Sequence, residues 1–226
     1  MIKKGYIFDL DGVIVDTAKY HYLAWKALAK SIGIDFTPEQ NEQLKGISRE
    51  RSLKKILEWG NQTLPDEVFL KLMAQKNEDY LSYIAKMNHS EILPDVTKIL
   101  NYLAKQDQPI ALGSASKNSR QILEKVNLLN QFDAIVDGND VTQAKPNPEV
   151  FLKAAKKLKV PAEDCVVFED AVAGIQAANA ANMISIGIGE ASVLHEADFV
   201  FKDFTEISSD FIDKISNLKK KDLKKV

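Results

Sequence analysis

The chain of 226 residues has one cysteine, little net charge and no long apolar run. The single cysteine, Cys165, excludes an intramolecular disulfide, and its apolar neighbours predict a small core residue. The net charge of −2 argues against a general nucleic-acid-binding protein. No apolar stretch reaches the ~18 residues of a membrane span, and the first residues lack the apolar centre of a signal peptide. We therefore expect a cytoplasmic protein without a nucleic-acid or membrane partner.

A lysine-rich stretch at residues 219–225 is an exception in a chain with little net charge. Its position at the end of the chain favours a frayed, solubilising terminus over a binding arm. We also see no internal repeat and no low-complexity linker, and we expect the protein to work as a monomer.

The stretch from Tyr6 to Val13 organises the rest of the chain. Three apolar residues, 6–8, predict a buried strand, and Asp9 and Asp11 follow it directly. Gly12 then permits a turn, which places both acids at the carboxyl end of the strand, where α/β sheets bind ligands. Two such carboxylates can share a divalent cation, or can act as nucleophile and proton donor. A solvated Asp-x-Asp turn is the alternative that the motif alone leaves open.

The rest of the chain divides into a helical part and an alternating part. Residues 17–88 predict helices only, whereas strands and helices alternate from residue 94 onward, which is typical of a parallel sheet. We therefore expect a Rossmann-like α/β core, formed by residues 1–15 and 89–226, and an all-helical cap inserted at 16–88. The expected helices are 17–32, 38–45, 49–59, 65–87, 96–105, 117–126, 148–159, 171–181 and 209–218, and the expected strands are 6–8, 109–113, 132–136, 165–168, 183–186 and 198–201.

Further polar groups follow the later strands of the expected sheet. Ser114 and Ser116 lie before a helix, where a hydroxyl and backbone N–H groups can hold phosphate, although Ser116 also suits a helix cap. Lys145 is followed by two prolines within three residues, which stiffen the backbone around it and so hold its positive charge in a fixed position, as suits the binding of phosphate. Glu169 and Asp170 repeat the strand-to-acid arrangement of Asp9 and would complete an oxygen ligand set for Mg²⁺. All of these groups should meet at one edge of the sheet.

The motifs at Asp9–Val13, Ser114, Lys145-Pro146 and Glu169-Asp170 resemble the four motifs of the haloacid dehalogenase superfamily of phosphoryl-transfer enzymes. The resemblance covers the whole chain, and the helical insert is placed like the cap of one subgroup. It also suggests a cis peptide bond at Lys145-Pro146. Within that subgroup the chain is similar to the β-phosphoglucomutase family, and the similarity lies at residues 16–18, 21, 24–28, 45–50, 76–77, 114–118 and 173–176.

This resemblance implies interconversion of β-D-glucose 1-phosphate and D-glucose 6-phosphate through β-glucose 1,6-bisphosphate. Asp9 would be the phosphorylated nucleophile and Asp11 the general acid and base, with Thr17 and His21 positioning Asp11. One Mg²⁺ would be held by Asp9, Asp170 and the main-chain carbonyl of Asp11, with Glu169 either close by or bound directly. Ser114 and Lys145 would stabilise the transferring phosphoryl group. The implied substrate contacts are Trp25, Lys45, Gly46, Arg49, Ser52, Lys76 and Asn77 in the cap and Ser114, Ala115, Ser116, Lys117 and Asn118 in the core.

Several alternatives remain at this point. Lys45, Lys76 and Asn77 also suit a solvated helix face, and Trp25 suits the core of the cap. A phosphatase of small sugar phosphates would share the fold and the motifs but would let water attack the aspartyl-phosphate. A phospho-aspartate switch would not need the helical insert, and a phosphonate-cleaving relative would need a Schiff-base lysine in the cap.

Overall fold

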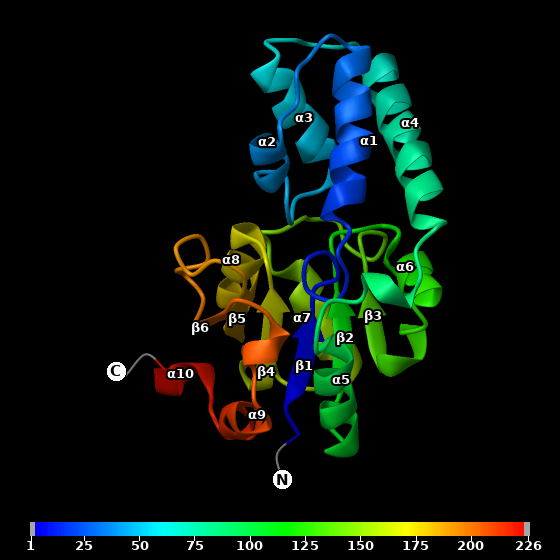
Figure 1. The fold of residues 1–226 in the computed structure, drawn as a ribbon. Helices are drawn as coiled ribbons and strands as arrows, with labels where there is room; N and C mark the ends of the chain where they lie inside the picture. Colours follow the sequence, from blue (N-terminus) through cyan, green and yellow to red (C-terminus); the bar gives the residue numbers. More distant parts are fainter. Residues whose placement is uncertain (1–2, 224–226) are drawn as a thin grey trace.

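The computed structural model describes residues 3–223 and shows an α/β core below a group of helices (Figure 1). Six strands form one sheet in the order β3-β2-β1-β4-β5-β6, and every pairing is parallel. β1 therefore lies inside the sheet between β2 and β4, as a strand of buried residues requires. The strands are β1 (Gly5–Phe8), β2 (Ile110–Gly113), β3 (Ala134–Val136), β4 (Cys165–Glu169), β5 (Ile184–Ile188) and β6 (Phe199–Phe201).

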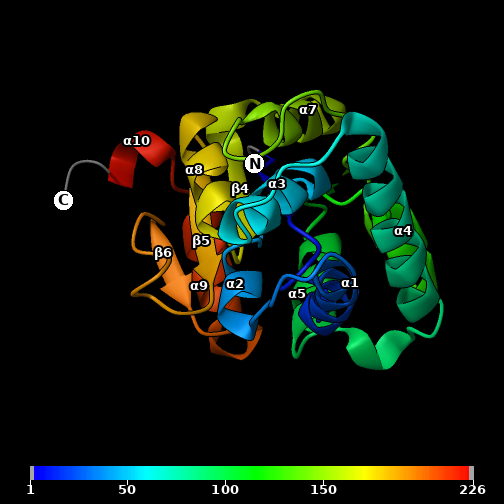
Figure 2. The same cartoon turned by 90° about the horizontal axis from the view of Figure 1, so that it is seen from above.

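Helices cover both faces of this sheet. Tyr6 and Phe8 point to one face, where α5, α6 and α9 pack, whereas Ile7 points to the other face, against α7 and α8. Figure 2 shows α5 and α9 on one side of the strands and α7 and α8 on the other. Alternate residues of a strand point to opposite faces, so an apolar run is required where both faces are covered. These helices are α5 (Val96–Lys105), α6 (Ser119–Lys125), α7 (Glu149–Leu158), α8 (Val172–Ala180) and α9 (Ser209–Ser216).

The helices after β1 have a hydrophobic cluster of their own. It includes Trp25, Phe36 and Leu53 and is distinct from the two clusters of the sheet. Two connections join this helical part to the core and lie side by side, because Asp16 N–H donates to the Glu91 carbonyl at 3.0 Å. The helices are α1 (Ala18–Ser31), α2 (Pro38–Glu42), α3 (Arg49–Trp59) and α4 (Asp66–Ile84).

The element types agree with the sequence predictions, and most bounds differ by only a few residues. α3 begins and ends where predicted, because the Ser48 hydroxyl accepts the Arg51 N–H at 3.4 Å and Gly60 follows its last turn. The helix cap suggested for Ser116 is wrong, because α6 begins after Asn118. The Thr17 hydroxyl donates to Asp11 and makes no capping hydrogen bond to α1. Cys165 is fully buried, as predicted, and no helix within residues 3–223 is both long and apolar enough to cross a membrane.

The basic C-terminal stretch is not frayed over residues 219–223, which corrects the sequence prediction; residues 224 and 225 lie outside the described part. A short helix, α10 (Lys220–Leu223), follows α9. The Lys220 side chain is buried and donates to Asn179 Oδ1 at 2.7 Å and to the Asp198 carboxylate. Lys219 Nζ lies 3.1 Å from Asp164 Oδ1. These lysines therefore fasten the end of the chain to the edge of the core.

We expect Lys220→Met to lower the free energy of unfolding by about 2 kcal/mol, because it removes the ammonium that pairs with the largely buried carboxylate of Asp198 and leaves only the hydrogen bonds from Ser185. The exposed Lys221 is the matched control, and Lys221→Met should change stability by less than about 0.5 kcal/mol. Urea unfolding of both variants measures the difference. Equal stability of the two variants would contradict the anchoring role of Lys220.

Candidate active site

The site begins where β1 ends, in the middle of the sheet. Phe8 stacks on Phe168 of β4, with ring centroids 4.6 Å apart, and the Asp9 N–H donates to the Phe168 carbonyl at 3.0 Å. The chain then turns so that the Asp11 N–H donates to Asp9 Oδ2 at 3.1 Å. Gly12 has a φ of +78°, and a Cβ there would lie 2.1 Å from Asp170 Oδ2. Glycine is therefore required both for the turn and for the approach of Asp170.

Lys145 balances the charge of the nucleophile candidate. Its ammonium donates to the Asp9 carboxylate and to Glu169 Oε2, the latter at 2.8 Å, and all three side chains are almost fully buried. Burial alone would lower the pKa of Lys145, but the charges of Asp9 and Glu169 raise it above its ordinary value. The lysine is therefore a permanent cation, and the peptide bond that follows it is cis.

The acids at the ends of β1 and β4 form a set of oxygen ligands. Asp9, Glu169 and Asp170 each place a carboxylate oxygen within 4.8 Å of the others. Burial, and then the charge of Asp9, raises the pKa of Asp170 to about 7 and that of Glu169 well above its ordinary value. Such crowding of acids is relieved by a hard divalent cation, so these residues fit Mg²⁺.

The acids differ in how much room they leave for an ion. Glu169 already accepts from Lys145 and, at 3.3 Å, from the Ala171 N–H, and a Cβ on Gly174 would lie 2.0 Å from its carboxyl carbon. It is thus fixed from several sides. The Asp11 carboxylate lies outside the three-acid cluster. Only the main-chain carbonyl of Asp11 remains as the expected ligand from that residue.

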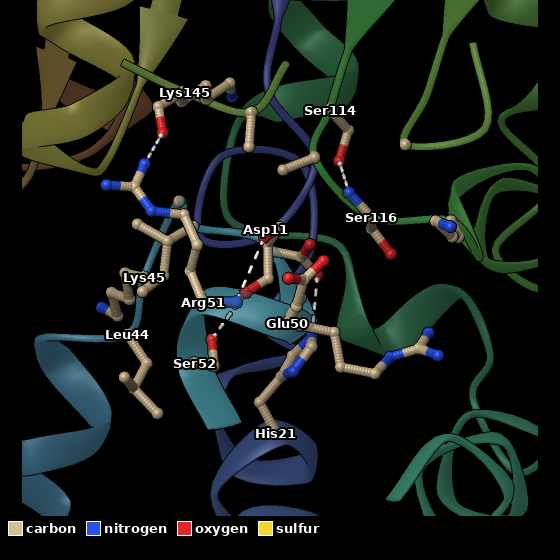
Figure 3. A pocket seen from close by; sticks show the side chains of 18 of the residues that line it. Asp11, His21, Leu44, Lys45, Glu50, Arg51, Ser52, Ser114, Ser116 and Lys145 are labelled. Carbon is tan, nitrogen blue, oxygen red and sulfur yellow. Dashed lines mark hydrogen bonds and ion pairs between the residues drawn. The ribbon is translucent and has the colours of Figure 1, made fainter. Parts of the chain in front are cut away.

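The Asp11 carboxylate instead faces residues at the start of the helical part of the chain. The Thr17 hydroxyl donates to Asp11 Oδ1, and His21 Nε2 lies 4.0 Å from the same oxygen (Figure 3). Burial, followed by the charge of Asp9, raises the pKa of Asp11 to about 6. A carboxyl group with a pKa near neutrality can both donate and accept a proton, which is what general acid–base catalysis needs.

His21 is held in turn by Lys76, whose Nζ lies 3.0 Å from His21 Nδ1. Burial, then the charges of Lys76 and Arg49, keeps the pKa of His21 well below its ordinary value, so the imidazole is neutral. When Lys76 carries its proton, its ammonium can only donate, so Nδ1 of His21 accepts and the Nε2–H is directed to the side of Asp11. Burial, followed by the charge of Arg49, lowers the pKa of Lys76 to about 7. Lys76 lies over the rings of Trp25 and Tyr80 and is not on a solvated helix face.

The cap and the core also meet on the other side of the site. Asn77 Oδ1 accepts from Arg49 Nη2 at 2.6 Å and from Asn118 Nδ2 at 3.1 Å, so one amide joins α4, α3 and the loop after β2. In that loop the Ser114 hydroxyl accepts the Ser116 N–H at 3.1 Å. Arg49 and this loop therefore offer a second group of anion-binding donors, separate from Lys145.

A cavity of about 480 Å³ lies between the cap and the carboxyl edge of the sheet. Every residue predicted for the site from the sequence lines this cavity except Asn77 and Glu169, which hold neighbouring residues in place. A cavity of this size suits a small polar ligand. The predicted lining residues are Asp9, Asp11, Thr17, His21, Trp25, Lys45, Gly46, Arg49, Ser52, Lys76, Ser114, Ala115, Ser116, Lys117, Asn118, Lys145 and Asp170.

Two of the lining residues that the sequence analysis did not name for the site are Tyr80 and Arg51. Tyr80 follows Lys76 by one helical turn, so the helical period was a signal for it. Arg51 reaches the main-chain carbonyl of Lys145 at 3.2 Å. No local pattern marks Arg51, because its partner lies in a distant part of the chain.

Comparison with known proteins agrees with this geometry. The sequence pattern of haloacid dehalogenase-like hydrolases matches residues 6–188. The chain is 40% identical to the β-phosphoglucomutase of Bacillus subtilis over 92% of this chain and 93% of that protein. It is 32% identical to a fructose-1-phosphate phosphatase of Escherichia coli over 81% of this chain and 95% of that protein.

A solved structure has the same fold. The crystal structure of β-phosphoglucomutase from Clostridium difficile superposes with a TM-score of 0.91, at 41% identity, over 96% of this chain and 98% of that one. Together with the matched pattern and the acid-bearing strand ends, this shows that the chain belongs to the haloacid dehalogenase-like hydrolase family.

Proposed function

We propose that the protein is a β-phosphoglucomutase, which interconverts β-D-glucose 1-phosphate and D-glucose 6-phosphate. The observation that carries the proposal is that two separate groups of anion-binding side chains line one cavity. Lys145 donates to Asp9, whereas Arg49 and Asn118 meet through Asn77. A ligand with a phosphate at each end, β-glucose 1,6-bisphosphate, suits this arrangement. The similarity to the enzymes of Bacillus subtilis and Clostridium difficile supports the same substrate.

The proposed reaction uses Asp9 as a phosphoryl carrier. The 6-hydroxyl of bound β-glucose 1-phosphate attacks the phosphorus of the aspartyl-phosphate, its proton passes to Asp11, and the bond from phosphorus to Asp9 breaks. The bisphosphate then turns, and Asp9 attacks the phosphorus at C1. Asp11 returns its proton to the C1 oxygen, which leaves D-glucose 6-phosphate and the phosphorylated enzyme. The raised pKa of Asp11 suits both directions of this proton transfer.

The remaining residues act through charge and position. Lys145 and Ser114 stabilise the charge of the transferring phosphoryl group, and Thr17 and His21 orient Asp11. Mg²⁺ would be held by Asp9, Asp170 and the Asp11 carbonyl, with Glu169 beside it, and would neutralise charge on the phosphoryl oxygens. Because all of these residues belong to one chain, a monomer suffices.

We further propose that residues 16–88 form a cap that opens and closes over a core of residues 1–15 and 89–226. The separate hydrophobic cluster of the helices supports this division. Gly46 favours close approach, since a Cβ there would lie 2.8 Å from Ala171 Cβ in the core. Closure would exclude water and leave the sugar hydroxyl as the acceptor. The proposed contacts that form on closure come from Trp25, Lys45, Gly46, Arg49, Ser52, Lys76 and Asn77 in the cap and from residues 114–118 in the core.

The alternative function is a phosphatase of small sugar phosphates. It is favoured by the similarity to the fructose-1-phosphate phosphatase of Escherichia coli. Both enzymes would form the same aspartyl-phosphate, so only the acceptor distinguishes them.

The deciding experiment supplies Mg²⁺, β-glucose 1-phosphate and a trace of glucose 1,6-bisphosphate, and follows glucose 6-phosphate and free phosphate together. We expect stoichiometric glucose 6-phosphate with little free phosphate. Asp9→Asn is the control and should lower either activity by about 10⁴-fold or more, because the carrier is lost. Free phosphate as the main product would instead establish the phosphatase.

Arg49→Ala should raise the KM for the sugar phosphates by about 10- to 100-fold, since a charge-assisted hydrogen bond to the second phosphate is lost. Lys54, on the same helix and exposed in an ion pair with Glu50, is the matched control. Lys54→Ala should leave KM unchanged. Steady-state kinetics of both variants checks the difference, and an unchanged KM for Arg49→Ala would refute its phosphate contact.

Mg²⁺ should bind more weakly to the metal-free protein as the pH falls through about 7. The pKa of Asp170 is raised to about 7, so below that pH a proton must leave before the ion binds. One competing proton raises the apparent Kd by about tenfold for each pH unit below the pKa, and the Kd levels off above it. Calorimetric titration with Mg²⁺ in acidic and alkaline buffers measures this. The same Kd in both buffers would show that Asp170 binds no competing proton.

A further inference from the structure

The cap contacts every loop of the core that carries a site residue. Three of these contacts involve residues that the sequence motifs identify. The fourth is made by Arg51, on the first turn of α3, and reaches the loop between β3 and α7. The four contacts are Thr17 with Asp11, Asn77 with Asn118, Lys45 with Asp170 at 3.6 Å, and Arg51 with Lys145.

Arg51 and Asp9 hold opposite ends of the same residue. Arg51 Nη1 donates to the main-chain carbonyl of Lys145 at 3.2 Å, as Figure 3 shows. The side chain of Lys145 leads away from this carbonyl to the buried Asp9 and Glu169 carboxylates. Within residues 3–223 this is the one side-chain hydrogen bond that joins α3 to the β3–α7 loop. A shift of the cap is thus transmitted through a single residue to the cation beside the nucleophile.

We propose that Arg51 is a positioning residue that couples closure of the cap to the placement of Lys145, and thereby determines how well the aspartyl-phosphate is kept from water. The inference rests on the proposed mutase function and adds a determinant of acceptor choice to it. Arg51 does not contact the reacting atoms in this scheme; it acts through the main chain of Lys145.

The two competing reactions differ only in the attacking oxygen. A sugar hydroxyl gives the bisphosphate and water gives free phosphate. In both, the attacking oxygen bonds to phosphorus, its proton passes to Asp11, and the bond between phosphorus and Asp9 breaks to restore the carboxylate. Water competes when the cap is open. Removing Arg51 takes one charge-assisted hydrogen bond from the closed state and none from the open state, so it shifts the population toward the open state.

Arg51→Gln tests the proposal in the full-length protein with Mg²⁺. The Arg51 side chain is largely exposed, so the hydrogen bond is screened and the variant should fold normally. We expect free phosphate released per glucose 6-phosphate formed to rise about three- to tenfold. KM for the bisphosphate should rise by a similar factor, whereas kcat for the mutase reaction should change little. Lys71→Gln, which removes an exposed cation from α4, is the control and should match the wild type.

Two measurements without turnover separate this proposal from the proposed function. Hydrogen exchange of the amides in residues 143–147 and small-angle scattering, both with Mg²⁺ and inorganic phosphate, report on the loop and on closure. We expect faster exchange and a larger radius of gyration for Arg51→Gln than for Lys71→Gln. Wild-type values for Arg51→Gln would overturn the coupling even if the mutase activity stands. If the wild type forms no glucose 6-phosphate but Arg51→Gln still shows these changes, the coupling is supported and the proposed function fails.

Discussion

The buried ion triad of Lys145, Asp9 and Glu169 is the interaction on which the site depends. Two carboxylates at the ends of neighbouring strands are unstable together in a dry interior, and the lysine between them makes the arrangement tolerable. It also fixes the position of the Asp9 carboxylate, which is the nucleophile in the proposed reaction. Asp170 adds a third carboxylate, and the three acids together fit a divalent cation. The same ion triad thus makes the buried carboxylates tolerable in the fold and holds the charged groups of the site in place.

The position of the Asp11 carboxylate is a second constraint on the site, because its partners lie outside the α/β core. Its partners Thr17 and His21 belong to the helical part, and Lys76 fixes His21 from α4. The carboxylate beside the nucleophile therefore depends on the position of the helices above it. In our scheme, closure of the cap both places Asp11 for proton transfer and excludes water from the site.

The sequence was sufficient for the strands, for the helical insert and for most of the charged residues that line the cavity. The strands and the acids that follow them are predicted by local patterns, whereas the cap residues of the site were implied by the resemblance to a known family. It was insufficient where a side chain chooses among partners that are distant in sequence. Lys220 donates to Asp198 across the fold, and Arg51 reaches the Lys145 carbonyl. Long side chains and hydroxyls satisfy several geometries equally well, so spacing alone does not select one.

The separate hydrophobic cluster around Trp25, Phe36 and Leu53 has an evolutionary consequence. Because these three residues pack in a cluster separate from those of the sheet, substitutions within that cluster leave the packing around the Asp9 end of β1 in place. A lineage can therefore acquire new sugar preferences by altering residues 16–88 while it inherits the same aspartate chemistry. The relatives include both a mutase and a phosphatase, which fits such a history, in which one catalytic core is combined with different caps.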